Sequence, residues 1–399
     1  MASTFPFTRL DSIEVFATED RVAQLVWRNL PDGIVGAIVK GRPQILGEGG
    51  RPGAAEVRGL DPDSHNSVDI TLDGRVIARR IISTTRSLEG PALSRIATIS
   101  DLHLGETGFG LVKEMREKAG PTKGYPLRCA LAAAREAEEW GADALVIKGD
   151  ITELGMPEHW ALFDEFLSEI SIPVIAIPGN HDTFGKPGSI DATEALQSRG
   201  LFDSPIQIRD LPGLRVVAAD TTTPRHTWGR IRHLSDELER AVDISEPTLL
   251  LLHHHLETHP YPRIWPLGTP KRQARDVLDR LATANPDLLV SSGHTHRNRA
   301  RRHGSAVITE VSATKDHPGV WAGYVAHPNG IRQVTRRVAE PSCIEWNDRT
   351  HAAVGGAWGK WSPGRLGDRS FVHEWTRPST ATAESPRATQ SSDTSSESV

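Results

Sequence analysis

The chain has 399 residues, which is enough for one large α/β domain and a smaller one, and 38% of them are hydrophobic. Its 46 Lys and Arg residues nearly balance its 51 Asp and Glu residues, and the net charge of −5 excludes general electrostatic attraction to nucleic acid or to anionic membranes. No apolar run approaches the roughly 20 residues of a membrane helix, so we expect no membrane partner. The N-terminus lacks the pattern of a signal peptide and there are only two cysteines, so we expect a cytoplasmic protein.

Residues 8–90 contain short apolar segments interrupted by Gly, Pro and Asp. Examples are IEVFA, AQLVW, VGAIV and VDITL. Short strands with frequent turn signals are typical of a β-sandwich, so we predict a small all-β sandwich domain. Three roles stay open for it: covering the mouth of a site, forming a homodimer, or adding stability.

The pattern changes over residues 94–340. Apolar runs of strand length, such as RIATIS, ALVIKG, PVIAIPG, TLLLLH and DLLVSSG, now alternate with helical segments such as PLRCALAAAREAEEW and RQARDVLDRLATA. The alternation predicts βα units around a buried sheet, and we expect it to continue to about Val338.

Residues 341–375 include Trp346, Trp358, Trp361 and Trp375 among Gly and charged residues. We predict an extension that docks its indoles onto the preceding domain. Residues 376–399 are rich in Ser and Thr and contain no aromatic residue, which predicts a disordered tail.

Metal-binding residue types follow the apolar runs at their C-terminal ends. In open α/β sheets this edge binds ligands, because the carboxyl ends of parallel strands meet there. Buried carboxylates that converge would repel one another, and cations would relieve that cost. Seven nitrogen and oxygen donors suit two ions of Mn, Fe, Co or Zn, with a carboxylate as the natural bridge. These candidates are Asp101, His103, Asp150, Asn180, His253, His294 and His296.

The ordered motifs D-x-H, G-D, G-N-H-D, a histidine after an apolar run, and G-H-x-H resemble those of the calcineurin-like metallophosphoesterases. The resemblance covers about residues 94–340 and implies a four-layer α/β/β/α sandwich with two divalent or trivalent metal ions. One ion would be held by Asp101, His103, Asp150 and His296. The other would be held by Asp150, Asn180, His253 and His294, with Asp150 as the bridge. His181 matches the catalytic histidine that contacts the phosphate and assists the leaving group.

Within this family the chain is most similar in style to bacterial cyclic-nucleotide phosphodiesterases, whose corresponding strand also ends in several histidines. Purple acid phosphatases place a tyrosine where this chain has Glu153, which argues against a purple Fe(III) centre. The G-D-x-V-D-R-G motif of Ser/Thr protein phosphatases is also absent, since ITELG follows Asp150.

We therefore expect a hydrolase that cleaves a small phosphate ester, either a diester such as a cyclic nucleotide or a monoester, with a metal-bridged hydroxide. A nuclease of the same fold is an alternative that the basic residues 296–304 favour and the acidic total charge opposes. A noncatalytic interaction protein is a third, which the complete ligand set opposes.

Several local roles stay open. Alternation along a strand predicts that His254 does not share a face with His253, and His255 either reaches the pocket rim or is structural. Asp182 either holds the His181 imidazole or caps the next turn. Residues 259–270 form either a lid or a rigid connection, and His226 and Trp228 lie in a second candidate rim loop.

Overall fold

The structure is a computed structural model that describes residues 13–110, 112–117, 122–242, 246–258 and 266–376. The predicted disordered tail, apart from Thr376, lies outside this range, as do residues 259–265 of the segment predicted to be a lid or a rigid connection. No helix among the described residues is long and apolar enough to cross a lipid bilayer.

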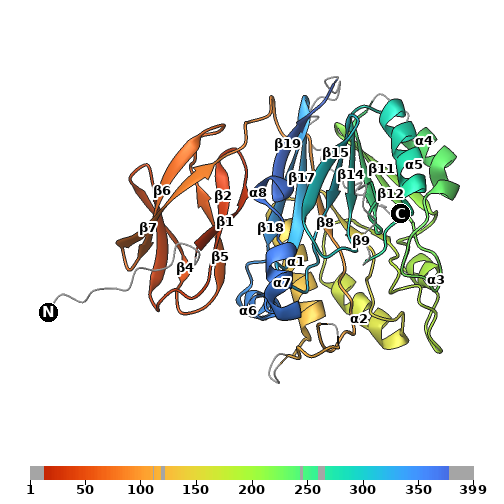
Figure 1. The fold of residues 1–399 in the computed structure, drawn as a ribbon, viewed down its shortest axis with the longest axis horizontal. Helices are drawn as coiled ribbons and strands as arrows, with labels where there is room; N and C mark the ends of the chain where they lie inside the picture. Colours follow the sequence, from red (N-terminus) through yellow and green to blue (C-terminus); the bar gives the residue numbers. More distant parts are fainter. Residues whose placement is uncertain (1–12, 111, 118–121, 243–245, 259–265, 377–399) are drawn as a thin grey trace, which may run out of the picture.

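The first seven strands form two antiparallel sheets that pack face to face (Figure 1, red to orange). Leu25, Val57 and Ile70 are fully buried between them, because successive side chains of a strand point to opposite faces. This arrangement confirms the small β-sandwich. One sheet has the order β1 (Ile13–Thr18), β2 (Val22–Trp27), β5 (Gly53–Arg58), and the other has β4 (Arg42–Glu48), β3 (Ile34–Val39), β6 (His65–Leu72), β7 (Arg75–Ser83).

The rest of the chain builds two six-stranded sheets. The first has the order β10 (Val174–Ile177), β9 (Ala144–Lys148), β8 (Ser94–Ile99), β17 (Val320–His327), β18 (Gly330–Arg337), β19 (Ser370–Glu374). The second has β11 (Ile206–Leu211), β12 (Leu214–Ala219), β13 (Thr248–Leu252), β14 (Leu288–Ser292), β16 (Ala306–Glu310), β15 (Arg299–His303). Strands β10, β9 and β8 run parallel in the first sheet, as do β12, β13, β14 and β16 in the second.

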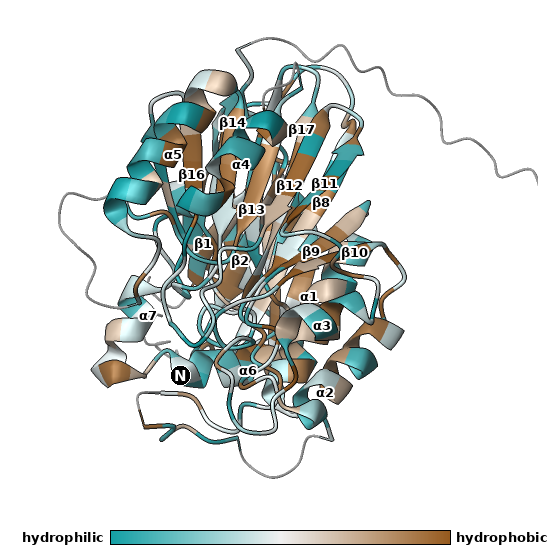
Figure 2. Ribbon diagram, turned by 90° about the vertical axis from the view of Figure 1, so that its right-hand side faces the viewer, coloured by the Kyte–Doolittle hydropathy of each residue, from teal (hydrophilic) through white to brown (hydrophobic). Residues whose placement is uncertain are grey.

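Helices cover the outer face of each sheet, and the sheets pack on each other. One helical layer contains α1 (Tyr125–Glu139), α2 (Pro157–Ser168), α3 (Ala192–Gln197) and α6 (Pro341–Thr350), and the other contains α4 (Ser235–Val242) and α5 (Lys271–Ala284). The strands are mainly hydrophobic, whereas α4 and α5 show hydrophilic residues on their outer sides (Figure 2). The result is the four-layer α/β/β/α sandwich that the sequence predicted.

The four consecutive leucines of β13 reflect these two buried faces. Leu249 and Leu251 pack between the sheets, and Leu250 and Leu252 pack under the helices. A strand buried on both faces is apolar at every position, and this one lies between two parallel neighbours.

The expected alternation of strands and helices up to Val338 is wrong beyond β14. Residues 299–337 contain four strands and no helix. Two antiparallel pairs form there because Gly304 and Ser305 connect β15 to β16, and Pro328 and Asn329 connect β17 to β18. Such two-residue links make hairpins rather than crossovers.

The tryptophan-rich segment packs against the sandwich through its indoles. After α6 it forms the 3₁₀ turn η3 (Val354–Gly356), then α7 (Ala357–Trp361), α8 (Leu366–Arg369) and β19. Trp346 stacks on Tyr125 of α1 with ring centroids 4.0 Å apart, and Trp358 meets Phe109 edge-on at 5.5 Å. Strand β19 pairs with β18, so this segment completes the first sheet (Figure 1, blue).

Candidate active site

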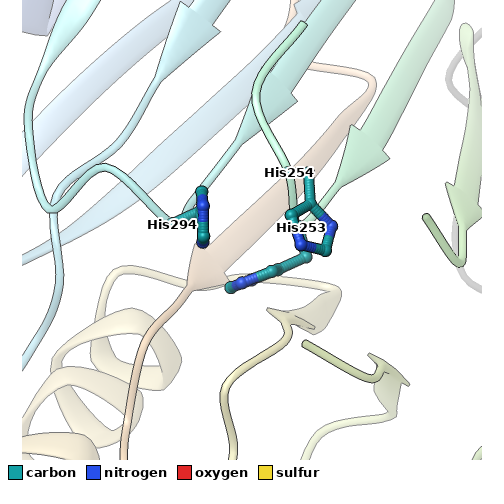
Figure 3. A group of neighbouring side chains, drawn as sticks. All are labelled: His253, His254 and His294. Atoms are coloured by element: carbon teal, nitrogen blue, oxygen red, sulfur yellow. The ribbon is translucent and has the colours of Figure 1, made fainter. Parts of the chain in front are cut away.

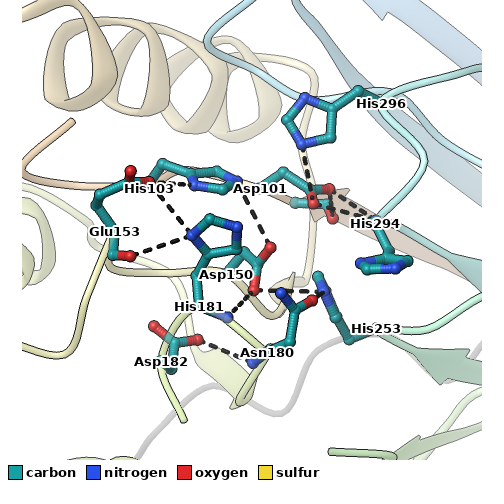
Figure 4. Close-up of polar contacts among 12 residues, drawn as sticks. Asp101, His103, Asp150, Glu153, Asn180, His181, Asp182, His253, His294 and His296 are labelled. Atoms are coloured by element: carbon teal, nitrogen blue, oxygen red, sulfur yellow. Dashed lines mark hydrogen bonds and ion pairs between the residues drawn. The ribbon is translucent and has the colours of Figure 1, made fainter. Parts of the chain in front are cut away.

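The predicted site residues lie together at the carboxyl ends of strands from both sheets (Figure 4). Strands β8, β9 and β10 deliver one group of them, and β13 and β14 deliver the other. Because the two sheets stack with these ends on the same side, residues up to two hundred positions apart meet in one cluster. Its members are Asp101, His103, Asp150, Asn180, His181, His253, His294 and His296.

Asp150 lies at the centre of the cluster and faces a different histidine with each oxygen. Its Oδ2 is 3.5 Å from His103 Nε2, and its Oδ1 is 3.3 Å from His253 Nε2. The side-chain oxygen of Asn180 lies 3.1 Å from the same His253 nitrogen. Each oxygen of Asp150 therefore faces a histidine of a different predicted ligand set.

Asp101 occupies the other end of the cluster. Its Oδ1 lies 3.4 Å from His296 Nε2, and the backbone N–H of His294 donates to both of its oxygens at 3.1 Å. Possible donor atoms of Asp101, His103 and His296 lie within 4.8 Å of one another, as do those of Asp101, Asp150 and His253. Donors from both predicted ligand sets therefore lie in one compact cluster.

The backbone is unusual at most of these positions. Five candidate ligands have a positive φ, a region that non-glycine residues seldom adopt and that stores strain at functional sites. They are Asp101 (56°), His103 (49°), Asp150 (49°), His294 (67°) and His296 (47°). The turns that aim these side chains inward are thus maintained at a cost in local stability.

Glycines in the motifs allow this close packing. Gly149 has a φ of 84°, and a Cβ placed there would lie 2.7 Å from His253 Nδ1. A Cβ at Gly179 would collide with the backbone and carboxylate of Asp150. Side chains at these two positions would push the donors apart.

The donors fit cations because each candidate histidine has one nitrogen already engaged by a protein acceptor. Such an acceptor fixes the tautomer and leaves the other nitrogen free to bind a metal. His103 Nε2 illustrates the consequence, since it is buried and has no hydrogen-bond partner. The engaged pairs are His103 Nδ1 with Glu153 Oε2 (2.8 Å), His253 Nδ1 with Lys148 O (2.8 Å), His294 Nε2 with Leu267 O (2.9 Å) and His296 Nδ1 with Asp316 Oδ2 (2.7 Å).

Electrostatics also favour positive charge at this position. Burial acts to raise the pKa of Asp150, but the surrounding histidines outweigh it and hold the pKa well below its usual range. Burial acts to lower the pKa of His253, yet Asp150 and Asp101 raise it to about 9. The buried carboxylates therefore need positive partners, and bound cations would serve in place of protonated histidines.

A cavity of about 410 Å³ opens over the cluster. Its polar floor includes Asp150 and His181. Phe109, Leu267 and Trp358 form apolar walls, and none of the residues that line it comes from the N-terminal sheets within the described chain. This volume lies in the range of roughly 300–1,000 Å³ that is typical of small-molecule sites.

A sequence model of the family described as calcineurin-like phosphoesterase matches residues 94–298, just over half of the chain. The chain belongs to the calcineurin-like phosphoesterase family. It is therefore a hydrolase of ester bonds, and the donor cluster lies inside the matched region.

This phosphoesterase is 28% identical over 242 residues to a probable cyclic nucleotide phosphodiesterase of Synechococcus sp., covering 57% of this chain and 85% of the relative. It is 29% identical to a probable cyclic nucleotide phosphodiesterase of Rhodococcus erythropolis (43% of this chain, 57% of the relative). It is also 26% identical to a cAMP/cGMP dual specificity phosphodiesterase of Mycobacterium tuberculosis (43% and 54%). The matches thus span little more than half the length of the latter two relatives.

Among solved structures, a dimetal phosphatase from Danio rerio aligns with 72% of this phosphoesterase and 100% of its own chain. The alignment has 12% identity and a TM-score of 0.48.

The supporting roles of three residues of the phosphoesterase were not predicted from the sequence. Glu153 holds His103 as described and also lies 3.3 Å from His181 Nδ1. Asp316 holds His296, and Trp358 Nε1 in turn donates to Asp316 Oδ1 at 3.1 Å. Asp316 and Trp358 lie outside every motif, and no periodic pattern marks them. Glu153 could have been found from its place three residues after Asp150.

Asp182 braces the loops of the site rather than the His181 imidazole. Its carboxylate accepts hydrogen bonds from the backbone of Gly179 (2.8 Å), Ile151 (3.1 Å) and Thr152 (2.7 Å). These contacts of Asp182 match neither open role, because they join the loop that precedes it to the loop that follows Asp150.

The expectation that His254 shares no face with His253 is wrong. The two rings lie 4.8 Å apart, and both lie close to His294. Alternation does not apply because β13 ends at Leu252, so the histidines follow the strand rather than continue it. His255 is buried and stacks on His294, with ring centroids 5.8 Å apart.

Proposed function

We propose that this phosphoesterase hydrolyses a small phosphodiester at a site that holds two cations. One observation carries the proposal: the Asp150 carboxylate lies between two compact sets of nitrogen and oxygen donors on the floor of a cavity of small-molecule size. The names of relatives, which include cyclic nucleotide and glycerophosphodiester phosphodiesterases, support a diester substrate.

The ligand assignment follows the two donor sets. Asp101, His103, Asp150 and His296 would hold one ion, and Asp150, Asn180, His253 and His294 would hold the other. Nitrogen and oxygen donors without thiolate suit Mn, Fe, Co or Zn. When bound, the two ions would supply the positive charge and Lewis acidity that phosphate ester hydrolysis requires.

His181 is placed to donate a proton to the departing oxygen. Its Nδ1 is held by the backbone oxygen of Glu153 at 3.1 Å, and its ring lines the cavity. Burial acts to lower the pKa of His181, but the carboxylates of Asp150 and Glu153 outweigh it and raise the pKa, which favours the proton-donating form. A positioned acid of this kind contributes about 10²–10⁴-fold.

The cavity sets the expected size and charge of the substrate. Phe109 and Trp358 offer apolar area for a base or another non-polar group. Lys113 lies at the rim about half exposed, and its ammonium is 2.9 Å from Glu153. These features suit a small anionic ester with one apolar portion, as in a cyclic nucleotide.

A panel assay on protein loaded with Mn, Fe, Co or Zn tests the proposal. Its substrates are 2′,3′- and 3′,5′-cyclic nucleotides, a glycerophosphodiester, aryl phosphate mono- and diesters, and single-stranded DNA. We expect turnover of at least one small diester that exceeds turnover of the matched monoester. Hydrolysis of DNA alone, or of monoesters alone, would contradict the proposed substrate class.

The ion pairs of residues 296–304, the basic segment that favoured a nuclease, argue against that alternative. The guanidinium of Arg301 lies 2.6 Å from Glu310, and that of Arg299 lies 3.9 Å from the same carboxylate. His303 pairs with Asp279 at 2.7 Å. Local acidic residues therefore offset part of the positive charge that would attract a polynucleotide. The intact donor set also argues against the noncatalytic alternative.

A further inference from the structure

A third imidazole, that of His254, lies beside two of the candidate ligands at the ends of β13 and β14 (Figure 3). The ring centroids of His253, His254 and His294 form a triangle with sides of 4.8, 4.8 and 5.0 Å. One nitrogen from each ring lies within 4.8 Å of the other two. All three side chains are buried.

The two nitrogens of His254 have the same unequal environments as those of the proposed ligands. Nδ1 lies 2.9 Å from the hydroxyl oxygen of Thr221, whereas Nε2 is buried and has no hydrogen-bond partner. The Thr221 oxygen has two lone pairs, so it can accept from Nδ1–H as well as from the His254 backbone N–H at 3.3 Å. In that arrangement Nε2 carries a free lone pair.

The imidazole of His254 cannot easily turn away from this position. Gly229 packs directly against it, and a Cβ at Gly229 would lie 2.6 Å from the ring Nδ1. On the other side the ring meets that of His253 at an interplanar angle of 83°. A buried nitrogen in a fixed ring with no partner is costly unless something binds it.

We propose that His254 Nε2 is an additional ligand of the cation held by His253 and His294. The inference rests on the proposed function, because it assumes that the second ion binds between Asp150 and Asn180. This ion would then have three imidazoles in addition to its oxygen donors. Such a nitrogen-rich set favours Zn, Fe or Co over Mg or Mn at this position.

The test is ¹H NMR of the protein loaded with Co²⁺. Each ligand imidazole whose other nitrogen carries a buried proton gives a separate exchangeable resonance that the paramagnetic ion shifts strongly. We expect five such resonances in the wild-type protein, from His103, His253, His254, His294 and His296. The count does not depend on whether any variant folds.

His254→Gln assigns the fifth resonance. We expect that resonance to disappear while the other four remain, and we expect chelator competition to show at least about tenfold weaker binding of one Co²⁺ with the other ion unaffected. His233→Gln changes an exposed histidine by the same substitution and should leave both readouts unchanged.

Two outcomes separate the hypotheses. Four shifted resonances in the wild-type protein, with an unchanged spectrum in His254→Gln, would show that His254 only packs against the site. No shifted imidazole resonances at all would instead reject the two-cation site on which the proposed function depends.

Discussion

Asp150 is the residue on which both proposed ion sites depend, because its two oxygens face histidines of different sets. Asp150→Asn replaces one oxygen by an NH₂ group, which cannot bind a cation. We expect metal content after dialysis to fall from two ions per chain to fewer than one, with activity lost in parallel. Elemental analysis measures the metal. The exposed Asp210→Asn variant is the control, and full metal retention in Asp150→Asn would contradict the bridging role.

His181 should affect chemistry without affecting metal content. Its imidazole is held by Glu153 and is not needed for either ligand set. In His181→Ala we expect kcat to fall by about 10²–10⁴-fold for esters with alkoxide leaving groups, and by much less for p-nitrophenolate, which needs no proton. Steady-state kinetics over a series of leaving groups measures this difference. An equal loss across the series would argue against a proton donor.

At the residue scale, the sequence predicted the proposed metal ligands, but not the residues that hydrogen-bond to those ligands and orient them. Asp101 and His253 were found because each directly follows an apolar run. Asp316 was missed because its hydrogen bond to His296 spans twenty positions and belongs to no motif. Such outer contacts depend on how loops meet in three dimensions.

At the element scale, the segment of α6, α7 and β19 contributes a residue to the wall of the candidate site. Trp358 lines the cavity and donates to Asp316, which in turn holds His296. Trp346 donates to the backbone oxygen of the neighbouring Lys315 at 2.8 Å. The segment therefore fixes the loop that orients one proposed ligand, although it lies outside the region that matches the family.

Trp358→Phe tests this connection, since it keeps an aromatic wall but removes the N–H donor to Asp316. We expect about tenfold weaker metal binding at the His296 site, with KM for the substrate little changed. Isothermal titration with Zn²⁺ or Co²⁺ measures the affinity. Trp361→Phe is the matched control, because Trp361 lies in the same helix and its ring is tilted against that of Trp358, with centroids 5.5 Å apart. If Trp358→Phe and Trp361→Phe bound the metal with the same affinity, Trp358 would have only a packing role.

Elements were predictable where hydrophobic patterning was strong. The TLLLL strand and the helix with buried Ala274, Val277, Leu278 and Leu281 both follow from apolar spacing. The hairpins after residue 299 were not foreseen, because β15 reads RARRH and lies half buried at a sheet edge. An edge strand needs little hydrophobicity, so its sequence resembles a loop.

At the scale of the whole molecule, Glu136 couples fold stability to pH. Its carboxylate accepts hydrogen bonds from Trp321 Nε1 (3.0 Å) and from the Ala339 backbone N–H (2.6 Å), which joins α1 to β17 and to the start of the C-terminal segment. Burial raises the pKa of Glu136 from 4.5 to about 7 in the folded protein. The folded state therefore binds more protons than the unfolded state between these values, and stability falls as pH rises through that window.

Glu136→Gln should reduce this pH dependence. We expect wild-type stability to fall between pH 5 and pH 7 by about 1–3 kcal/mol more than that of the variant, because only the wild type must ionise the Glu136 carboxyl. Denaturant unfolding in the presence of a chelator measures the difference without a contribution from metal binding. Glu139→Gln, at an exposed position, is the control. Parallel pH profiles for Glu136→Gln and wild type would contradict the assignment.

The four-layer architecture was predictable from the resemblance together with the alternating pattern, and the all-β start from short strands and turns. The contacts between these parts were not. Arg337, for example, exchanges hydrogen bonds with Gln24 at 2.7 and 2.8 Å across more than three hundred positions. The domain boundaries at residues 90–94 and 340 stay a prediction.

The last strand also has a consequence for how the protein is made. The Ser370 hydroxyl accepts from the Thr18 backbone N–H at 3.0 Å, and Arg369 donates to the Phe16 carbonyl at 2.6 Å. A ribosome delivers Phe16 long before Arg369, so the growing polypeptide must be extended by 353 residues before these two contacts can form. Until β19 is synthesised and pairs with it, the edge of β18 is unpaired and can bind another extended chain. Prompt pairing of β19 therefore protects newly made molecules from aggregation.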